Sequence, residues 1–186
     1  MKVKIFKPAQ MLIGINVPTN QHGHAGRFIE NKLEEIGVKV NRGHGPDFID
    51  YGLELKTRAV DATSAQTVAD MSIEDIIALD YKDSHVFKKF QQQLRVYIKD
   101  NIVVSADVYD FSHSSVQELI EQAYDHAKDQ LIKCNDLTRT EYKDYYGYFE
   151  KVDANRKTFS FRLSKSDMEA LEGMAKSNYK NLFSEE

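Results

Sequence analysis

The sequence has little cysteine and proline, no tryptophan and no long apolar run. Its 186 residues include one cysteine, three prolines and no tryptophan. Because the single Cys134 cannot form an internal disulfide, a reducing compartment fits, and we expect a soluble, cytoplasmic protein. The apolar stretch Met11–Ile15 is far shorter than the roughly 20 residues that a membrane helix needs, and no signal-peptide pattern precedes it.

An excess of positive charge is also absent. The formal net charge is −4 at pH 7, whereas proteins that bind nucleic acids usually carry a basic surface. The distribution of charge matters more than its sum, because the acids are dense at Glu118–Asp129, in a predicted helix that could face away from DNA. Basic residues gather elsewhere in the sequence, at Arg42, Arg58, Lys88, Lys89, Arg95 and from Arg156 to Lys165. The net charge alone therefore does not exclude a DNA-binding protein.

The length favours one domain, with no repeat, low-complexity segment or linker rich in proline or glycine. A chain of this size buries roughly 70% of the surface that its unfolded state exposes, which is enough for a hydrophobic core. We predict a single domain over residues 1–186, with one lobe at roughly 1–112 and a helix–hairpin–helix portion at roughly 113–186. Alternating helices and strands predict an α/β or α+β fold with a central mixed β-sheet flanked by helices.

Apolar periodicity and capping signals predict the helices. The first spans roughly 25–36, with Ile29, Leu33 and Ile36 as its apolar stripe and Gly37 as its C-cap. The others are a short helical turn at 73–79, a helix from Ser84 to about Gln93, a long helix opened by a Ser115–Glu118 capping box, and a last helix at roughly 167–178 opened by a Ser166–Glu169 box.

Runs of apolar and β-branched residues between turn signals predict the strands. The predicted strands span residues 38–41, 47–60, 66–71, 94–98, 102–109, 145–152 and 158–163. Lys99-Asp100-Asn101 turns between the strands at 94–98 and 102–109, and Asp153-Ala154-Asn155 turns between the last two.

The most informative segment is Pro46–Thr57, which reads Pro-Asp-Phe-Ile-Asp-Tyr-Gly-Leu-Glu-Leu-Lys-Thr. Glu54 and Lys56 are two residues apart, so on a strand both side chains leave the same face. Asp47 lies seven residues before Glu54, next to a turn signal rich in glycine, and a hairpin would bring the two acids together. Two hard carboxylates for Mg²⁺ and one ammonium for the attacked phosphate are the groups that a metal-dependent nuclease needs.

The Glu-x-Lys spacing is weak on its own, because a chain of this length should hold on the order of one such triplet by chance. Two further triplets, at 30–32 and 141–143, lie in a predicted helix and in a polar run. Only the triplet of Glu54 and Lys56 combines a strand, a preceding turn and a companion acid. The alternative interpretation is a solvated strand face that carries Glu54, Lys56 and Arg58. Asp50 is the rival to Asp47, but it lies too close to Glu54 for a separate turn.

The run from Asp47 to Thr57 resembles the catalytic signature of the MutH-type branch of the PD-(D/E)xK nucleases, which contains the mismatch-repair nicking endonuclease and related GATC-cleaving type II restriction enzymes. Two other segments agree with this resemblance. Ser84–Lys89 is similar to a Ser-His-Val-x-x-Lys segment of the family, and Gly26–Glu30 is similar to the helix that supplies a further acid. The C-terminal hairpin and Tyr179-Lys180 match the DNA-contacting region more loosely.

The resemblance implies a restriction-endonuclease-like core and Mg²⁺-dependent hydrolysis of double-stranded DNA, sequence-specific and of the restriction or nicking kind. Asp47 and Glu54 would bind the metal, with the Leu55 carbonyl as a third ligand. Lys56 would orient or deprotonate the attacking water, or stabilise the charge that develops on the phosphate. Glu30 would complete a second metal site or hold a water at the first.

Lys89 would act at the scissile phosphate, because it falls on a lysine that the family needs for activity. Cleavage of both strands usually needs two active sites, which a homodimer or two successive binding events would supply. The residues predicted to contact DNA are Arg42, His44, Arg58, Lys88, Arg156, Lys157, Arg162, Lys165 and Tyr179.

Three other functions stay open from the sequence. They are a structure-selective or repair nuclease with the same core, a catalytically silent DNA-binding module with the same fold, and a generic metal- or protein-binding domain. His22, His24 and His44 do not form a zinc set, because no cysteine pair joins them. Plasmid cleavage with and without Mg²⁺ separates these functions.

Overall fold

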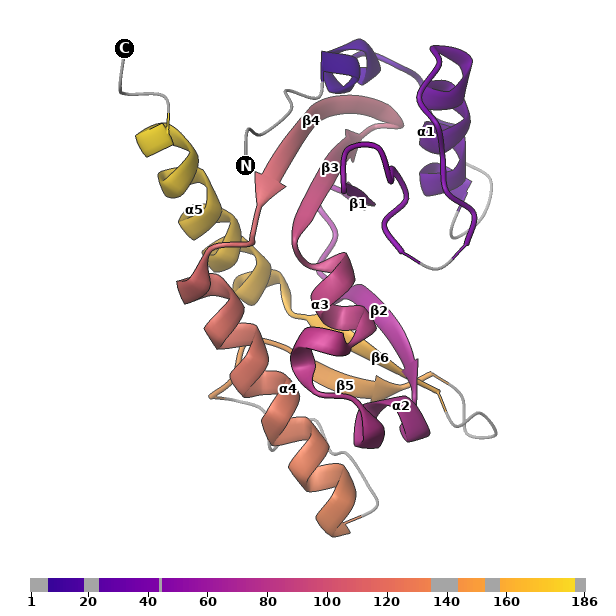
Figure 1. Ribbon diagram of the computed structural model, residues 1–186. Coiled ribbons are helices and arrows are strands. Elements are labelled where there is room, and N and C mark those ends of the chain that lie inside the picture. Colours follow the sequence, from indigo (N-terminus) through magenta and orange to yellow (C-terminus); the bar gives the residue numbers. More distant parts are fainter. Residues whose placement is uncertain (1–6, 19–23, 44, 135–143, 153–157, 183–186) are drawn as a thin grey trace. The chain divides into compact units, whose positions relative to one another are not determined.

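The structure is a computed structural model that describes residues 7–18, 24–43, 45–134, 144–152 and 158–182 (Figure 1). The chain divides into two units. One comprises residues up to Ala62 together with Gln91–Tyr109, and the other comprises Thr63–Phe90 and the residues from Asp110 on. Each unit has a three-stranded sheet with helices beside it, which confirms the predicted mixed α/β class, although the strands form two small sheets. No helix in the described part of the chain is long and apolar enough to cross a membrane.

The sheet of the first unit has the order β1-β3-β4. β1 (Glu54–Ala59) runs parallel to β3 (Gln92–Lys99), and a two-residue turn at Asp100 and Asn101 joins β3 to β4 (Ile102–Asp110). Both turn residues have positive φ angles, 50° and 63°, which a tight hairpin turn requires and which aspartate and asparagine tolerate. The predicted pairing of these last two strands is therefore confirmed, and the sheet is mixed.

The first predicted helix is confirmed as α1 (His24–Glu35). Two residues of its predicted apolar stripe, Ile29 and Leu33, are fully buried, whereas Ile36 is exposed. Gly37 ends the helix at a φ of +89°, and its N–H and that of the next residue donate to carbonyls of the last helical turn. This is the Schellman arrangement, in which glycine is favoured because its positive φ meets no Cβ penalty.

The core of the first unit joins the buried face of α1 to the apolar face of the sheet and to the short 3₁₀ helix η1 (Lys7–Leu12). These elements are close together in Figure 1. The buried members of this core are Ala9, Leu12, Val17, Ile29, Leu33, Val38, Phe48, Leu53, Leu55, Leu94, Val96, Val103 and Ala106.

Two strand predictions in the first unit are wrong in extent. Residues 38–41 form no strand, and of residues 47–60 only Glu54–Ala59 joins a sheet. Residues 48–53 form a tight turn instead, closed by an isolated bridge in which the N–H groups of Phe48 and Leu53 donate to each other's carbonyls at 2.8 and 3.2 Å. Because both side chains are buried in the core, the turn is anchored at its two ends.

The sheet of the second unit has the order β2-β6-β5 and is antiparallel. β2 (Gln66–Ser72) confirms the strand predicted near 66–71, and β5 (Tyr148–Lys151) with β6 (Thr158–Leu163) confirms the C-terminal hairpin. The turn predicted at 153–155 lies outside the described residues. A helix, α4 (Ser114–Cys134), packs against β5, and α5 (Lys165–Leu182) packs against α4.

Three short helices lie between β2 and β3 in the sequence: α2 (Ile73–Ala78), the 3₁₀ helix η2 (Tyr81–Asp83) and α3 (His85–Lys89). The predicted turn at 73–79 is confirmed as α2. The helix predicted to run from Ser84 to Gln93 begins where expected, because the Ser84 hydroxyl accepts a hydrogen bond from Phe87 N–H at 3.1 Å. It ends at Lys89, however, because the chain enters β3 at Gln92.

The predicted capping boxes are displaced from the observed helix starts. α5 is capped by Ser164, whose hydroxyl accepts from Asp167 N–H at 3.1 Å while the Asp167 carboxylate accepts from Ser164 N–H at 3.1 Å. This reciprocal pair lies two residues before the predicted Ser166–Glu169 box. α4 likewise begins one residue before Ser115, which therefore lies in the first turn of the helix.

Aromatic rings and one buried amide fill the core of the second unit. Phe149 of β5 meets Phe161 of β6 edge to face at 5.2 Å between ring centroids, and it meets Tyr124 of α4 at 5.8 Å. Tyr81 packs on Tyr124 at 5.7 Å, and its hydroxyl donates to the buried Gln117 amide oxygen at 2.8 Å. The helix α4 is thus fixed by packing on one side of the sheet and by a buried hydrogen bond to η2.

Gly147, just before β5, gives a stability prediction. Its φ is +101°, and an added Cβ would lie 2.6 Å from Phe161 Cζ and 3.0 Å from Leu163 Cδ2. We expect Gly147→Ala to lower the free energy of unfolding by roughly 2–4 kcal/mol, from backbone strain and overpacking together. Urea unfolding measures this change. The matched control is Gly173→Ala in α5, where nothing lies within 4 Å of the added Cβ and a helical alanine should be neutral or stabilising.

Candidate active site

The turn at residues 48–53 brings Asp47 back to the beginning of β1. The Asp47 Oδ2 atom accepts a hydrogen bond from Leu55 N–H at 2.7 Å, so this carboxylate lies against the peptide that joins Glu54 to Leu55. The rival acid, Asp50, is exposed within the turn itself. The structure therefore brings the acid seven residues before Glu54, and not the one four residues before it, to the backbone of the motif strand.

Glu54 and Lys56 leave the same face of β1 and form an ion pair, with Lys56 Nζ 3.0 Å from Glu54 Oε1. Their side chains are only 3% and 16% exposed, respectively. A carboxylate buried to this degree is costly unless a charge partner stabilises it, which Lys56 does here. The alternative of a solvated strand face does not hold for this pair. Of the other two Glu-x-Lys triplets, the one at 30–32 lies on α1 and the one at 141–143 lies outside the described residues.

The parallel pairing of β1 with β3 adds two residues to this face. Gln93 is in register with Glu54, and Arg95 is in register with Lys56. Both side chains belong to residues that are 1% exposed, and Arg95 Nη1 donates to Gln93 Oε1 at 3.2 Å. Since alternate residues of a strand share a face, four polar side chains form two adjacent rows, while Leu55 and Leu94 between them belong to the core.

The burial of Gln93 and Arg95 beside Glu54 and Lys56 was not predicted from the sequence. Gln93 fell within a predicted helix, and Arg95, in a predicted strand, was grouped only with the basic residues, although it is buried. The signal that was present is the strict alternation from Gln93 to Ile98, where polar residues alternate with Leu94, Val96 and Ile98. Read as a strand from residue 92, this alternation places both polar side chains on one face of that strand, although only the pairing with β1 brings them beside Glu54 and Lys56.

Charges of both signs lie on and beside this face. Asp47 and Glu54 carry two formal negative charges, and Lys56, Arg58 and Arg95 carry three positive charges. Because a buried charge is costly without an opposite charge nearby, the ion pair with Lys56 stabilises the buried Glu54 carboxylate. A divalent cation at the carboxylates would shift the set toward positive charge, which suits a negatively charged phosphate.

The donors at the start of β1 fit a hard divalent cation. The carboxylates of Asp47 and Glu54 and the Leu55 carbonyl are all oxygen ligands, which Mg²⁺ prefers, and the Asp47 carboxylate is oriented by the Leu55 N–H. Among the residues that the structure describes, no group of three or more histidine, cysteine, aspartate and glutamate side chains is placed to hold a metal ion. Two carboxylates are fewer ligands than Mg²⁺ takes, so water and phosphate oxygens would have to complete its coordination here.

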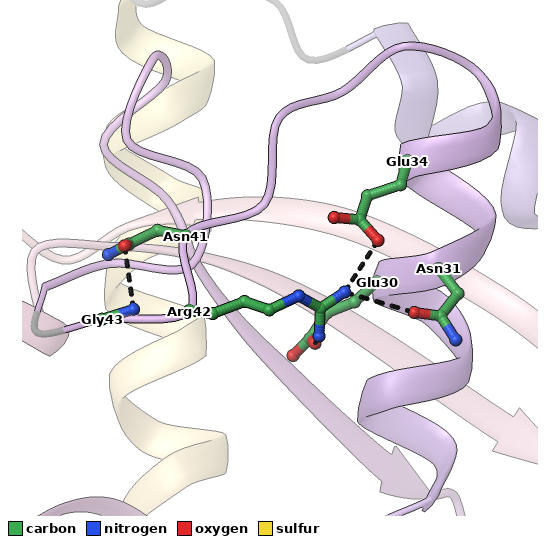
Figure 2. Close-up of polar contacts among 6 residues, drawn as sticks. All are labelled: Glu30, Asn31, Glu34, Asn41, Arg42 and Gly43. Atoms are coloured by element: carbon green, nitrogen blue, oxygen red, sulfur yellow. Dashed lines mark hydrogen bonds and ion pairs between the residues drawn. The ribbon is translucent and has the colours of Figure 1, made fainter.

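Glu30, the predicted further acid, lies beside Arg42 (Figure 2). Arg42 Nη1 lies 3.8 Å from Glu30 Oε2, and its Nη2 lies 2.7 Å from Glu34 Oε2 and 3.4 Å from Asn31 Oδ1. Arg42 was predicted to contact DNA, and its side chain is 50% exposed. The structure thus joins a predicted metal residue to a predicted DNA contact, and it ties the loop after Val40 to α1.

The remaining basic residues are placed in both units. Arg58 of β1 donates to the Ala62 carbonyl at 3.0 Å. Lys88 and Lys89 form the last turn of α3, where Lys88 is exposed and Lys89 is half-buried. Ser84 and Val86 also belong to the Ser84–Lys89 segment that resembles the family. Ser84 caps α3 and so sets where this short helix starts, and the buried Val86 sets its orientation.

The C-terminal candidates are held by acids. Arg162 of β6 forms an ion pair with Glu150 of β5 and donates to the Ala65 carbonyl at 3.2 Å. Lys165, the first residue of α5, lies 3.9 Å from Glu169. Three predicted DNA contacts, His44, Arg156 and Lys157, lie outside the described residues, and Tyr179 lies in α5 with its side chain outside them.

In a comparison with known protein families, a family model described as DNA mismatch repair enzyme MutH matches residues 36–134, which is more than half of the chain. The matched segment contains Asp47, Glu54, Lys56 and Lys89, whereas Glu30 precedes it. No curated protein matches the chain.

Proposed function

Since this chain belongs to the MutH family of DNA endonucleases, we propose that it is a Mg²⁺-dependent enzyme that hydrolyses phosphodiester bonds of double-stranded DNA at specific sequences, by restriction or by nicking. The observation that supports the proposal is the hydrogen bond from Leu55 N–H to the Asp47 carboxylate, which holds that acid at the start of the strand carrying Glu54 and Lys56. Asp47, Glu54 and the Leu55 carbonyl would hold the metal.

The side chains of this face prepare the site before DNA binds. Bound Mg²⁺ would supply Lewis-acid stabilisation of the phosphoryl oxygens and lower the pKa of water. The Leu55 N–H fixes the orientation of the Asp47 carboxylate, and Glu54 fixes the position of the Lys56 ammonium through their 3.0 Å ion pair. Lys56 then orients the attacking water or donates to the charge that develops on the phosphate, without a large rearrangement of its side chain.

Plasmid DNA incubated with the pure protein, with and without Mg²⁺, tests the proposal. Discrete fragments with mapped ends indicate a restriction-like enzyme, and nicked circles indicate a nicking enzyme. Retarded but uncut DNA in the presence of Mg²⁺, Mn²⁺ or Co²⁺ indicates a DNA-binding module and contradicts the catalytic proposal. A preference for branched or mismatched DNA over intact duplex would identify a structure-selective repair nuclease.

The proposal includes recognition of a DNA sequence and cleavage of both DNA strands. Arginine and lysine read guanine in the major groove, so Arg162 and Lys165, near the junction of β6 and α5, are our candidates for base contact. Cleavage of both strands needs two active sites, and we propose that two copies of the chain supply them on one duplex.

Lys89 is expected to act at the scissile phosphate, and its removal should separate turnover from binding. We expect Lys89→Ala to lower kcat for plasmid cleavage about 10²-fold, because removal of one preorganised donor typically has this effect. DNA affinity, measured by gel retardation in EDTA, should change little. The matched control is Lys82→Ala, an exposed lysine of η2 in the same unit, which should leave both quantities unaltered. Equal turnover of Lys89→Ala and the control would remove Lys89 from the chemistry.

A further inference from the structure

The side chain of Asn41 lies at the centre of the loop that leads into Asp47. Asn41 Oδ1 accepts a hydrogen bond from Gly43 N–H at 3.0 Å, which Figure 2 shows, and Asn41 Nδ2 donates to the Pro46 carbonyl at 3.2 Å. The amide thus bonds to the backbone on both sides of the loop tip, once as acceptor and once as donor. Asparagine suits this place because its side chain has both kinds of group on one short stem.

The backbone of Asn41 also fixes Asp47 directly. Asn41 N–H donates to the Asp47 carbonyl at 2.7 Å, while the Asp47 carboxylate accepts from Leu55 N–H at 2.7 Å. Asp47 is therefore held at its main chain by residue 41 and at its side chain by β1. The next residue, Phe48, is buried in the core and closes the following turn. The position of the Asp47 carboxylate therefore depends on the backbone hydrogen bond between Asn41 and Asp47.

The Asn41 amide lies beside a glycine whose conformation other residues rarely adopt. Gly45 has a φ of +121°, a conformation that side chains other than glycine rarely adopt, and an added Cβ there would lie 3.6 Å from Asn41 Nδ2. The Arg42 side chain extends outward from the same loop and contacts Glu30 and Glu34 of α1 (Figure 2). The amide of Asn41 therefore holds the backbone of this loop at two separate points, Gly43 and Pro46.

We propose that Asn41 is a positioning residue for the cation site, which acts through Asp47 by holding the backbone of Gly43 and of Pro46. No role was predicted for this residue from the sequence, because it fell at the end of a predicted strand. The inference depends on the proposed function, since Asp47 must be a metal ligand for its position to matter. Partners that orient metal ligands typically change metal affinity or activity 10- to 100-fold when removed, which makes the effect measurable.

The experiment measures Mn²⁺ binding by electron paramagnetic resonance and the kcat and KM of plasmid cleavage for Asn41→Ala and Asn41→Asp. We expect Asn41→Ala to weaken Mn²⁺ binding about tenfold and to lower kcat about 10²-fold, with KM for DNA within about twofold. Asn41→Asp keeps the acceptor for Gly43 N–H but loses the donor to Pro46, so a smaller loss is expected, and it serves as the test if Asn41→Ala does not fold. Gln10→Ala, an exposed amide of η1, is the matched control.

A double-mutant cycle separates positioning from general stability. If Asn41 acts through Asp47, then Asn41→Ala added to Asp47→Ala should weaken Mn²⁺ binding no further, although each change alone weakens it. Additive losses would overturn the inference, and so would wild-type kcat and Mn²⁺ affinity in both Asn41 variants. A wild-type protein that binds Mn²⁺ but does not cleave DNA would contradict the proposed function. The double-mutant cycle of Mn²⁺ binding would then still test the role of Asn41.

Discussion

Glu54→Gln is expected to abolish DNA cleavage, lowering kcat by at least about 10³-fold. The substitution keeps the size of a buried side chain but removes its charge, so the proposed metal site loses one of its two carboxylates. Metal-ion stabilisation of a phosphoryl transition state is worth several kcal/mol, and about 4 kcal/mol corresponds to this factor. The loss also removes the anion that holds Lys56 Nζ at 3.0 Å, so the position of the ammonium is affected as well.

Initial rates of plasmid cleavage at saturating Mg²⁺ measure this effect, and circular dichroism confirms that the variant folds. The matched control is Glu35→Gln on α1, an exposed glutamate that pairs with Lys32 and should retain full activity. Gel retardation in EDTA should show near-normal DNA affinity for both variants, because Glu54 is expected to act in the hydrolysis step and not in DNA binding. Cleavage by Glu54→Gln at the wild-type rate would remove this residue from the mechanism and would favour a solely structural role for its ion pair with Lys56.

Phe48→Ala is expected to destabilise the protein by about 3–5 kcal/mol and to weaken cation binding at the same time. The ring is fully buried in the core of the first unit, and truncation of a buried phenylalanine typically has this cost because a cavity is left. The backbone of Phe48 also closes the turn with Leu53, so loosening of this anchor moves the neighbouring Asp47. Stability and metal affinity should therefore fall together.

Urea unfolding and Mn²⁺ titration test this coupling. Ile49→Ala is the matched control, because Ile49 is the next residue of the same turn but is 62% exposed, and its truncation should change stability by less than about 0.5 kcal/mol. Loss of stability in Phe48→Ala with unchanged Mn²⁺ affinity at low temperature would show that the core anchor does not control the position of Asp47.

The local part of the candidate site could be predicted from the sequence. The spacing of Glu54 and Lys56 fixes their common face on any strand, and the turn residues before Leu53 indicate that Asp47 returns to that strand. The helix at 24–35 could also be predicted from the sequence, because its apolar stripe and Gly37 are local signals. These features depend on residues within about ten positions of each other, where pattern and structure agree.

The part that depends on pairing between distant residues could not be predicted. Lys88 to Gln93 has good helix-forming residues, yet Gln92 and Gln93 join β3 because the parallel ladder with β1 offers Gln93 a partner position beside Glu54. Tertiary context overrides local propensity at such places. The burial of Arg95 depends on the same ladder, so it could not be predicted from the local sequence either.

The displaced caps show a different limit. Near α5, Ser164 and Ser166 are each followed three residues later by an acid, Asp167 and Glu169, and so both pairs satisfy the same capping pattern. The choice between them depends on where β6 ends, at Leu163, because the helix starts directly after the strand. A local pattern cannot make that choice when two copies of it overlap.

The parallel ladder of β1 and β3 has a consequence for synthesis of the chain. The neighbour of the strand with Glu54 and Lys56 is made only after the ribosome has added residues 60–91, which include all of β2, α2 and α3. A nascent chain that has emerged only through Ala59 holds the acids and the lysine but lacks the strand that aligns them. Hydrolytic capacity is therefore expected to arise late in translation, after the nascent chain has emerged beyond Lys99.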